Sequence, residues 1–200
     1  LEVTNLTDYV VLNTSVASGE QDVNAFQSFN YLAAYNASNK AKVAAVATTY
    51  LEPMGIYANK VKTVDEFPQG ATIAIPNDTA NEARALTLLQ SAKLIKLKPG
   101  FDPVKGTVND IAENPKKLQF SYENDPALMV KFYQNGEGDL VSINANFAVD
   151  AGLNAATEPV LVEKATDDNP YANIVVVREG DKDKLVVKKL VAALKSEDTQ

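Results

Sequence analysis

The 200-residue sequence contains no cysteine and no histidine. Without cysteine there are no disulfide bonds, thiolate metal sites or cysteine nucleophiles. Without histidine there are no histidine-dependent catalytic triads, histidine-ligated metal sites or imidazole general bases. Carboxylates are present, but no HExxH, DxDxDG or P-loop pattern accompanies them. We therefore expect no metal site and no cofactor, and nothing in the sequence supports an enzyme.

Positive charge is also scarce, because 19 lysines and arginines face 26 acidic residues and leave a net charge of -7. An acidic chain without an arginine-rich run does not favour a nucleic-acid partner. No apolar run approaches the length that spans a bilayer. The hydrophobic fraction of 46% is sufficient for packed cores, either in one large domain or in two lobes of about a hundred residues each.

The clearest local pattern lies between residues 67 and 89. Turn residues at 67–70 precede a short β-branched run at 71–75, which Pro76 stops. Thr79-Ala80-Asn81-Glu82 matches a capping box and predicts that a helix begins there. This helix carries Arg84 near its start, where the helix dipole disfavours positive charge. Two explanations remain open. Arg84 either binds an anion such as a carboxylate, or pairs with Asp78 or Glu82 on a solvated surface.

Strand and helix patterns alternate along the rest of the chain. Alternation of this kind favours α/β lobes with mostly parallel sheets, whose ligand groups lie at the carboxyl ends of strands. The pattern restarts after Asp65, and the chain returns near Asn169-Pro170, so we expect lobe 1 to comprise residues 1–64 with 172–200 and lobe 2 to comprise 65–171. The expected strands are 2–5, 21–26, 41–49, 55–59, 71–75, 118–122, 139–143, 160–164 and 172–178.

Caps predict where several helices begin or end. Thr7 or Asp8 begins a helix that Gly19 ends, and Asp125 followed by proline begins another, which Gly136 closes. Asp183 is expected to cap the last helix. A short helical segment is expected at 108–114.

Three segments in the same order, LEPMGIYANK, GATIAIPND and NEARALTLLQ, resemble the methionine-binding lipoprotein family. Members of this family are the substrate-binding subunits of bacterial ABC importers for methionine. The resemblance covers nearly the whole chain. It implies a two-lobed periplasmic-binding-protein-like fold of type II, with an amino acid held in an interlobe cleft. It also implies a permease and ATPase complex as partners and an extracytoplasmic location, lipid-anchored to the bacterial cell membrane.

The resemblance further implies a set of ligand-binding residues. Arg84 would bind the carboxylate of the amino acid, and Asn144 and Asn173 would accept hydrogen bonds from its ammonium group. Asn81 is a weaker candidate for the same role. Aromatic residues would line the side-chain slot; they are Tyr9, Phe26 and Tyr31.

The sequence departs from the family pattern beside this expected pocket. Ser28 and Tyr50 stand where the family usually has histidine, and Ala25 replaces an aromatic residue. L-Methionine is the leading ligand, and another apolar amino acid or a short methionyl peptide is the alternative. A surface interaction or adhesin role on the same fold stays open. Relative to the family, the N-terminal strand and helix, the signal peptide with its lipidated cysteine and the C-terminal tail are expected to be missing from this copy.

Overall fold

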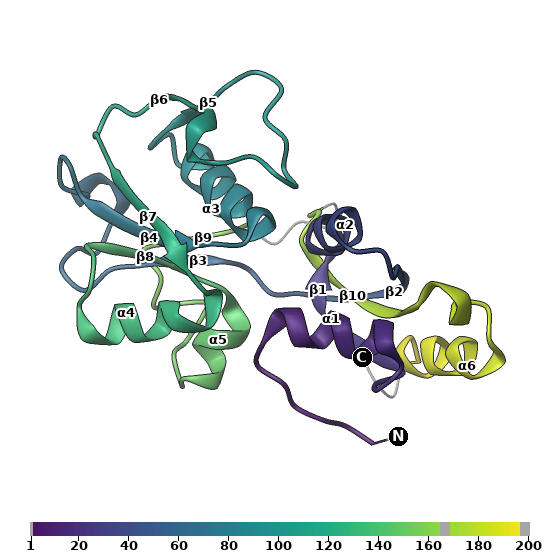
Figure 1. Cartoon of the computed structure of the whole chain (residues 1–200). Helices are drawn as coiled ribbons and strands as arrows, with labels where there is room; N and C mark the ends of the chain where they lie inside the picture. Colours follow the sequence, from purple (N-terminus) through teal and green to yellow (C-terminus); the bar gives the residue numbers. More distant parts are fainter. Residues whose placement is uncertain (1, 165–168, 197–200) are drawn as a thin grey trace. The chain divides into compact units, whose positions relative to one another are not determined.

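The computed structural model describes residues 2–164 and 169–196, and the chain divides into two compact units (Figure 1). Unit 1 consists of Leu1–Leu51 and Asp168–Gln200, and unit 2 of Glu52–Asp167. These boundaries differ from the expected ones at 64/65 and 171/172. The reason is that β3 (Gly55–Tyr57) pairs with strands of unit 2, which places the segment after Leu51 in that unit.

Unit 1 contains a three-stranded sheet in the order β1 (Val23–Ser28), β10 (Ala172–Arg178), β2 (Val43–Leu51). Both pairings are antiparallel, so the expected mostly parallel sheet is wrong for this unit. The cause is the returning strand β10, which lies between β1 and β2 and runs opposite to both. Residues 2–5, expected as a strand, have no regular structure.

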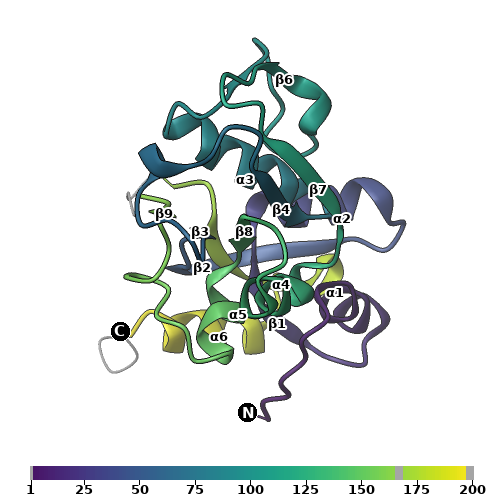
Figure 2. The ribbon, with the colours of Figure 1, turned by 90° about the vertical axis from the view of Figure 1, so that its left-hand side faces the viewer.

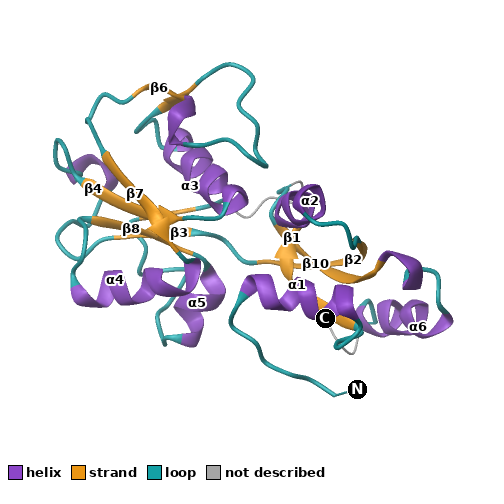
Figure 3. Cartoon of the chain, viewed as in Figure 1, coloured by secondary structure: helices purple, strands orange, loops and turns teal. Residues whose placement is uncertain are grey.

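Three helices accompany the sheet of unit 1 (Figure 3). α1 (Tyr9–Ser18) begins at Asp8, whose carboxylate accepts from two amides of the first turn, and ends at Gly19 with φ 88°, as expected. α2 (Phe29–Ser38) is capped by the Ser28 hydroxyl. α6 (Leu185–Leu194) follows Lys184, which makes no side-chain cap, so the expected cap at Asp183 is wrong.

A buried amide cluster joins α1 to β1 beside a small apolar core. Asn13 and Gln27 exchange two hydrogen bonds of 2.9 and 2.6 Å, and Asn24 donates to the Asn13 oxygen at 3.0 Å. Gln27 also donates to the Asn24 oxygen at 3.0 Å, and Asn24 to the Leu12 carbonyl at 2.8 Å. Every side-chain oxygen and nitrogen in the cluster has a partner, as buried polar groups require. The apolar core of unit 1 comprises Val16, Leu32, Val43, Ile174 and Val176.

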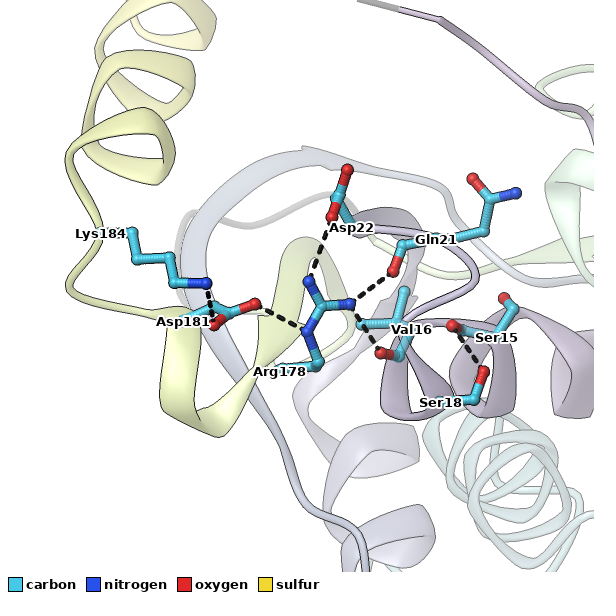
Figure 4. A network of polar contacts seen from close by, with 8 residues as sticks. All are labelled: Ser15, Val16, Ser18, Gln21, Asp22, Arg178, Asp181 and Lys184. Atoms are coloured by element: carbon cyan, nitrogen blue, oxygen red, sulfur yellow. Dashed lines mark hydrogen bonds and ion pairs between the residues drawn. The ribbon is translucent and has the colours of Figure 1, made fainter.

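Arg178 ties the end of β10 to the end of α1 (Figure 4). Its guanidinium donates to the Val16 and Gln21 carbonyls at 3.2 and 2.8 Å. It also pairs with Asp181 at 2.7 Å and with Asp22 at 3.1 Å. Two anions and two carbonyls of the chain therefore occupy this arginine, which fastens β10 to the end of α1.

Unit 2 is built on a mixed five-stranded sheet in the order β7 (Gln119–Asn124), β4 (Thr72–Pro76), β8 (Leu140–Ile143), β3, β9 (Leu161–Val162). β4 is parallel to β7 and β8, whereas β3 is antiparallel to β8 and β9. α3 (Thr79–Ser91) covers one face of the sheet, and α4 (Met129–Asn135) and α5 (Ala145–Asp150) cover the other (Figures 1 and 2). The parallel centre brings the carboxyl ends of β4 and β8 to one edge, where α3 and α5 begin.

Smaller elements complete the two units. The strands β5 (Lys96–Leu97) and β6 (Ile111–Glu113) pair with each other. The expected helical segment at 108–114 is only a 3-10 turn, η2 (Val108–Asp110), followed by β6. Further 3-10 turns are η1 (Val64–Glu66), η3 (Pro126–Leu128) and η4 (Glu179–Asp181). No helix within residues 2–164 and 169–196 has the length and apolar character needed to cross a membrane.

The core of unit 2 lies between α3 and the sheet. Ile73 and Ile75 of β4 pack with Leu86 and Leu89 of α3, and all four are fully buried. The start of α3 differs from the expected capping box, because Asp78 and not Thr79 is the N-cap. The carboxylate of Glu82 instead accepts from the Val108 amide at 2.9 Å and anchors the η2 turn.

Glu82 generates a prediction about pH and stability. Burial raises the pKa of Glu82, and Asp78 and Asp110 add to this effect against the lowering by the Val108 amide. The folded state therefore favours the protonated acid, so its contribution to stability is greatest below the unfolded pKa. That contribution is lost as pH rises through the folded pKa. Because glutamine keeps an oxygen for the Val108 amide without carrying charge, Glu82→Gln is expected to raise the melting temperature at pH 7. The gain should shrink at pH 4. Calorimetric melting at both pH values measures this difference, and an equal gain at both would contradict it.

Candidate functional site

Three aromatic rings form one cluster in unit 1. Tyr9 lies at the start of α1, Phe26 in β1 and Tyr31 in the first turn of α2. The Tyr9 and Phe26 ring centroids are 5.2 Å apart, and Tyr31 lies 5.6 and 5.7 Å from the other two in edge-to-face geometry. All three side chains are partly exposed. Such a cluster offers an apolar, polarisable surface to a ligand side chain.

The other expected residues of unit 1 lie on its three strands: Ser28 in β1, Asn173 in β10 and Tyr50 in β2. Ser28 ends β1 and is paired in register with Asn173 of β10. The Ser28 hydroxyl accepts from the Tyr31 amide at 3.3 Å, so it holds the turn that carries the third ring. The Asn173 side of β10 is joined to β2, because the Asn173 carbonyl accepts from the Thr49 hydroxyl at 3.2 Å. Tyr50, also in β2, is 61% exposed.

In unit 2, the expected residues Asn81 and Asn144 lie in direct contact at the shared edge of β4 and β8. Asn144 donates to the Asn81 side-chain oxygen at 2.8 Å. Asn81 in turn donates to both carboxylate oxygens of Asp78, at 3.0 and 2.9 Å. Burial raises the pKa of Asp78, although the hydrogen bonds from Asn81 act to lower it. The Asn144 side-chain oxygen is buried and accepts no hydrogen bond from the described residues.

Arg84 is buried in an ion pair that sequence analysis did not anticipate. Its Nε donates to Glu163 Oε1 at 2.8 Å and its Nη2 to Glu163 Oε2 at 2.6 Å. Nη2 also donates to the Glu52 carbonyl at 2.7 Å, and Glu163 accepts from the Met54 amide at 2.9 Å. Because Arg84 is only 6% exposed, the solvated surface pair with Asp78 or Glu82 is not the arrangement found. Glu163 lies 79 residues away, and no local pattern identifies it.

The expected residues thus fall into two groups, one in each unit. Unit 1 holds the aromatic cluster with Ser28, Tyr50 and Asn173, and unit 2 holds Asn81, Arg84 and Asn144. Sequence analysis did not single out Asp78 as the N-cap of α3, because the T-x-x-E pattern one residue later favoured Thr79. The position of Asp78 just before α3 is the local signal that could have identified it. Among the residues that the structure describes, no group of three or more acidic residues is arranged to hold a metal ion.

Comparison of the sequence with known proteins finds similarity along the whole chain, which includes both units. A family model described as NlpA lipoprotein matches residues 1–200. The chain is 40% identical over 197 residues to the methionine-binding lipoprotein MetQ of Bacillus subtilis, covering 98% of this chain and 71% of that protein. It is 37% identical over 198 residues to the D-methionine-binding lipoprotein MetQ of Escherichia coli K12, covering 99% and 72%.

Solved structures give the same result for the fold. A nutrient binding protein from Burkholderia cenocepacia bound to methionine is similar with a TM-score of 0.91 and 40% identity, covering 99% of this chain and 81% of that chain. The expectation of a two-lobed α/β fold of type II with helix-flanked sheets is therefore confirmed. The correction to mixed and antiparallel strand directions stands within that fold.

The Arg84–Glu163 pair generates a stability prediction. Arg84→Met leaves the Glu163 carboxylate buried without its cation, and loss of one partner of such a pair costs about 3–5 kcal/mol. The double variant Arg84→Met/Glu163→Gln removes the stranded charge and is expected to recover a large part of that loss. Lys96→Met, which breaks an exposed pair with Glu113, should cost no more than about 1 kcal/mol. Urea unfolding of the four proteins measures these differences. A double variant as unstable as Arg84→Met would contradict the prediction.

Proposed function

The chain belongs to the NlpA lipoprotein family, and from that premise we propose that it is a substrate-binding protein that captures methionine, or a closely related amino acid, for an ABC importer. The strongest single support is the methionine-bound structure from Burkholderia cenocepacia, which is 40% identical over 99% of this chain. The names of the related MetQ proteins support the same ligand class. The role is binding and delivery, and we propose no catalysis.

The chemistry of the two residue groups fits the parts of an amino acid. A zwitterion needs a cation for its carboxylate, acceptors for its ammonium group and an apolar surface for its side chain. In unit 2, we propose that Arg84 binds the ligand carboxylate and that the Asn144 oxygen accepts from the ligand ammonium group. Asn81, which contacts Asn144, is the weaker candidate for the acceptor role. In unit 1, Asn173 is a second proposed acceptor.

The aromatic cluster of unit 1 is the proposed surface for the ligand side chain. Methionine is unbranched and polarisable, and a thioether against an aromatic ring gains roughly 0.3–1.5 kcal/mol. Tyr9, Phe26 and Tyr31 present three such rings within 6 Å of one another, by centroid distances of 5.2, 5.6 and 5.7 Å. Ser28 contributes by holding Tyr31 in place.

The proposed partners and location come from the family. We propose that an ABC permease with its ATPase receives the amino acid. We propose further that the protein acts outside the cytoplasm as a lipoprotein attached to the bacterial cell membrane.

The role of Arg84 is tested with two variants, one that removes the anion paired with Arg84 and one that removes the guanidinium itself. Glu163→Gln keeps the guanidinium and removes the competing anion, so L-methionine affinity should hold or rise. Arg84→Met should weaken it about 10- to 150-fold, equivalent to roughly 1.5–3 kcal/mol for a charged hydrogen bond. L-Methioninol lacks the carboxylate, so its affinity should not fall in Arg84→Met. Isothermal titration calorimetry on protein that is folded at the assay temperature measures both ligands. Equal losses for methionine and methioninol would make Arg84 structural only.

The identity of the ligand is tested at Ser28. Where relatives have histidine, the smaller serine is expected to narrow the preference for methionine over leucine-like amino acids and methionyl dipeptides. Ser28→His should widen that preference. It also removes the α2 cap, at a cost of about 1 kcal/mol, so Ser28→Ala, which removes the cap without adding volume, is the matched control. A thermal-shift panel of amino acids and dipeptides compares each variant with its own ligand-free state. An equal margin of methionine over the other ligands in both variants would contradict the prediction, and a response only to a sugar or a metal ion would overturn the proposed function.

A further inference from the structure

Three polar side chains in unit 2 form a single hydrogen-bonded chain. Asp78 lies between β4 and α3, Asn81 in the first turn of α3, and Asn144 at the end of β8. Asn81 donates through Nδ2 to both oxygens of Asp78, and Asn144 donates through Nδ2 to the Asn81 oxygen at 2.8 Å. The Asp78 carboxylate also accepts from the Asn81 backbone amide at 2.9 Å, which fixes the carboxylate itself.

The direction of this chain follows from the donor and acceptor capacity of its members. Both oxygens of Asp78 accept hydrogen bonds from Asn81, so the NH2 group of Asn81 is turned toward Asp78. The Asn81 oxygen then faces Asn144, which donates a hydrogen bond to it from its own NH2 group. The Asn144 oxygen is thereby directed away from the chain. Either amide, taken alone, can be flipped without a change of shape, so Asp78 is what decides between the two directions.

A second observation concerns how Asn144 behaves as the N-cap of α5. An asparagine in this position commonly uses its oxygen to accept from an amide of the first helical turn. Asn144 makes no such side-chain bond. Its oxygen is buried and accepts no hydrogen bond from the described residues, and the residue as a whole is only 6% exposed. A buried acceptor of this kind calls for a donor, and a bound ligand is able to supply one.

We propose that Asp78 is a positioning residue for ligand recognition: through Asn81 it turns the Asn144 oxygen outward, so that unit 2 selects ligands carrying a primary ammonium group. Asp78 touches no ligand in this proposal and acts through the two amides. The inference rests on the proposed function, because it takes the ligand to be an amino acid. With the opposite amide direction, Asn144 would present its NH2 group and disfavour a cationic donor.

The test is Asp78→Asn, which preserves shape and lets both amide directions occur. L-Methionine affinity should fall, by about 2-fold if the two amide directions become equally populated and by more if the opposite direction dominates, whereas 4-(methylthio)butanoate, which lacks the ammonium group, should bind as it does to the wild type. Asp102→Asn is the matched control, because Asp102 is an aspartate of the same unit whose carboxylate accepts from the Val104 backbone amide at 2.8 Å. It should leave both affinities unchanged. Isothermal titration calorimetry measures the affinity of each protein for each ligand, and a competition titration is used for the ligand that binds more weakly. Equal losses for both ligands in Asp78→Asn would show a merely structural role and overturn the proposal.

A double-mutant cycle tests whether Asp78 acts through Asn144. In an Asn144→Ala background, Asp78→Asn should produce no further loss of methionine affinity, and a full additional loss would overturn the proposal. Failure of the proposed function is recognised separately, because wild-type protein would then bind no methionine at all. The amide direction is also checked without ligand, by NMR of the Asn81 and Asn144 side-chain NH2 groups. These signals should shift in Asp78→Asn and not in Asp102→Asn. Signals that do not shift in Asp78→Asn would overturn the inference, whether or not the proposed function holds.

Discussion

The buried pair between Arg84 and Glu163 is the interaction on which unit 2 depends. Unit 2 is a single stretch of chain, and the pair joins its two ends to its central helix. Arg84 reaches from α3 to the Glu52 carbonyl at the start of the unit and to Glu163 near its finish, and Glu163 accepts from the Met54 amide. The edge strand β9 and its neighbour β3, which pair with each other, are thereby held to the helix that covers the sheet.

In unit 1, a strand joins parts of the chain that are far apart in the sequence. Its two stretches of sequence are joined because β10 returns between β1 and β2 and pairs with both. Arg178, at the end of that strand, then fastens the α1 terminus by donating to the Val16 and Gln21 carbonyls. Each unit therefore depends on contacts between residues more than 75 positions apart, with separations of 79 for Arg84–Glu163 and 162 for Arg178–Val16.

This dependence explains which features the sequence predicts. The caps at Asp8, Gly19, Asp125 and Gly136 are correctly predicted, since each is decided by residues within one turn. The resemblance implied that Asn81 and Asn144 bind the ligand; the structure shows them in contact with each other, and their role in binding stays a prediction. Strand direction in unit 1 and the partner of Arg84 were missed, because both depend on residues that the chain brings back from far away. The capping box at Thr79 failed for a local reason, since a better cap, Asp78, stands one position earlier.

Two buried clusters of side-chain amides differ in whether every polar atom in them has a partner. In unit 1, Asn13, Asn24 and Gln27 satisfy every side-chain oxygen and nitrogen among themselves and the Leu12 carbonyl, so the cluster has nothing to offer a ligand. In unit 2, the chain of donors ends at an oxygen of Asn144 that no described residue satisfies. A cluster in which every polar atom has a partner makes the core rigid and specific. A cluster with one unsatisfied oxygen holds a buried acceptor in a fixed direction. Both clusters are built from side-chain amides, and the cluster in unit 2 differs in carrying a carboxylate, that of Asp78, at one end.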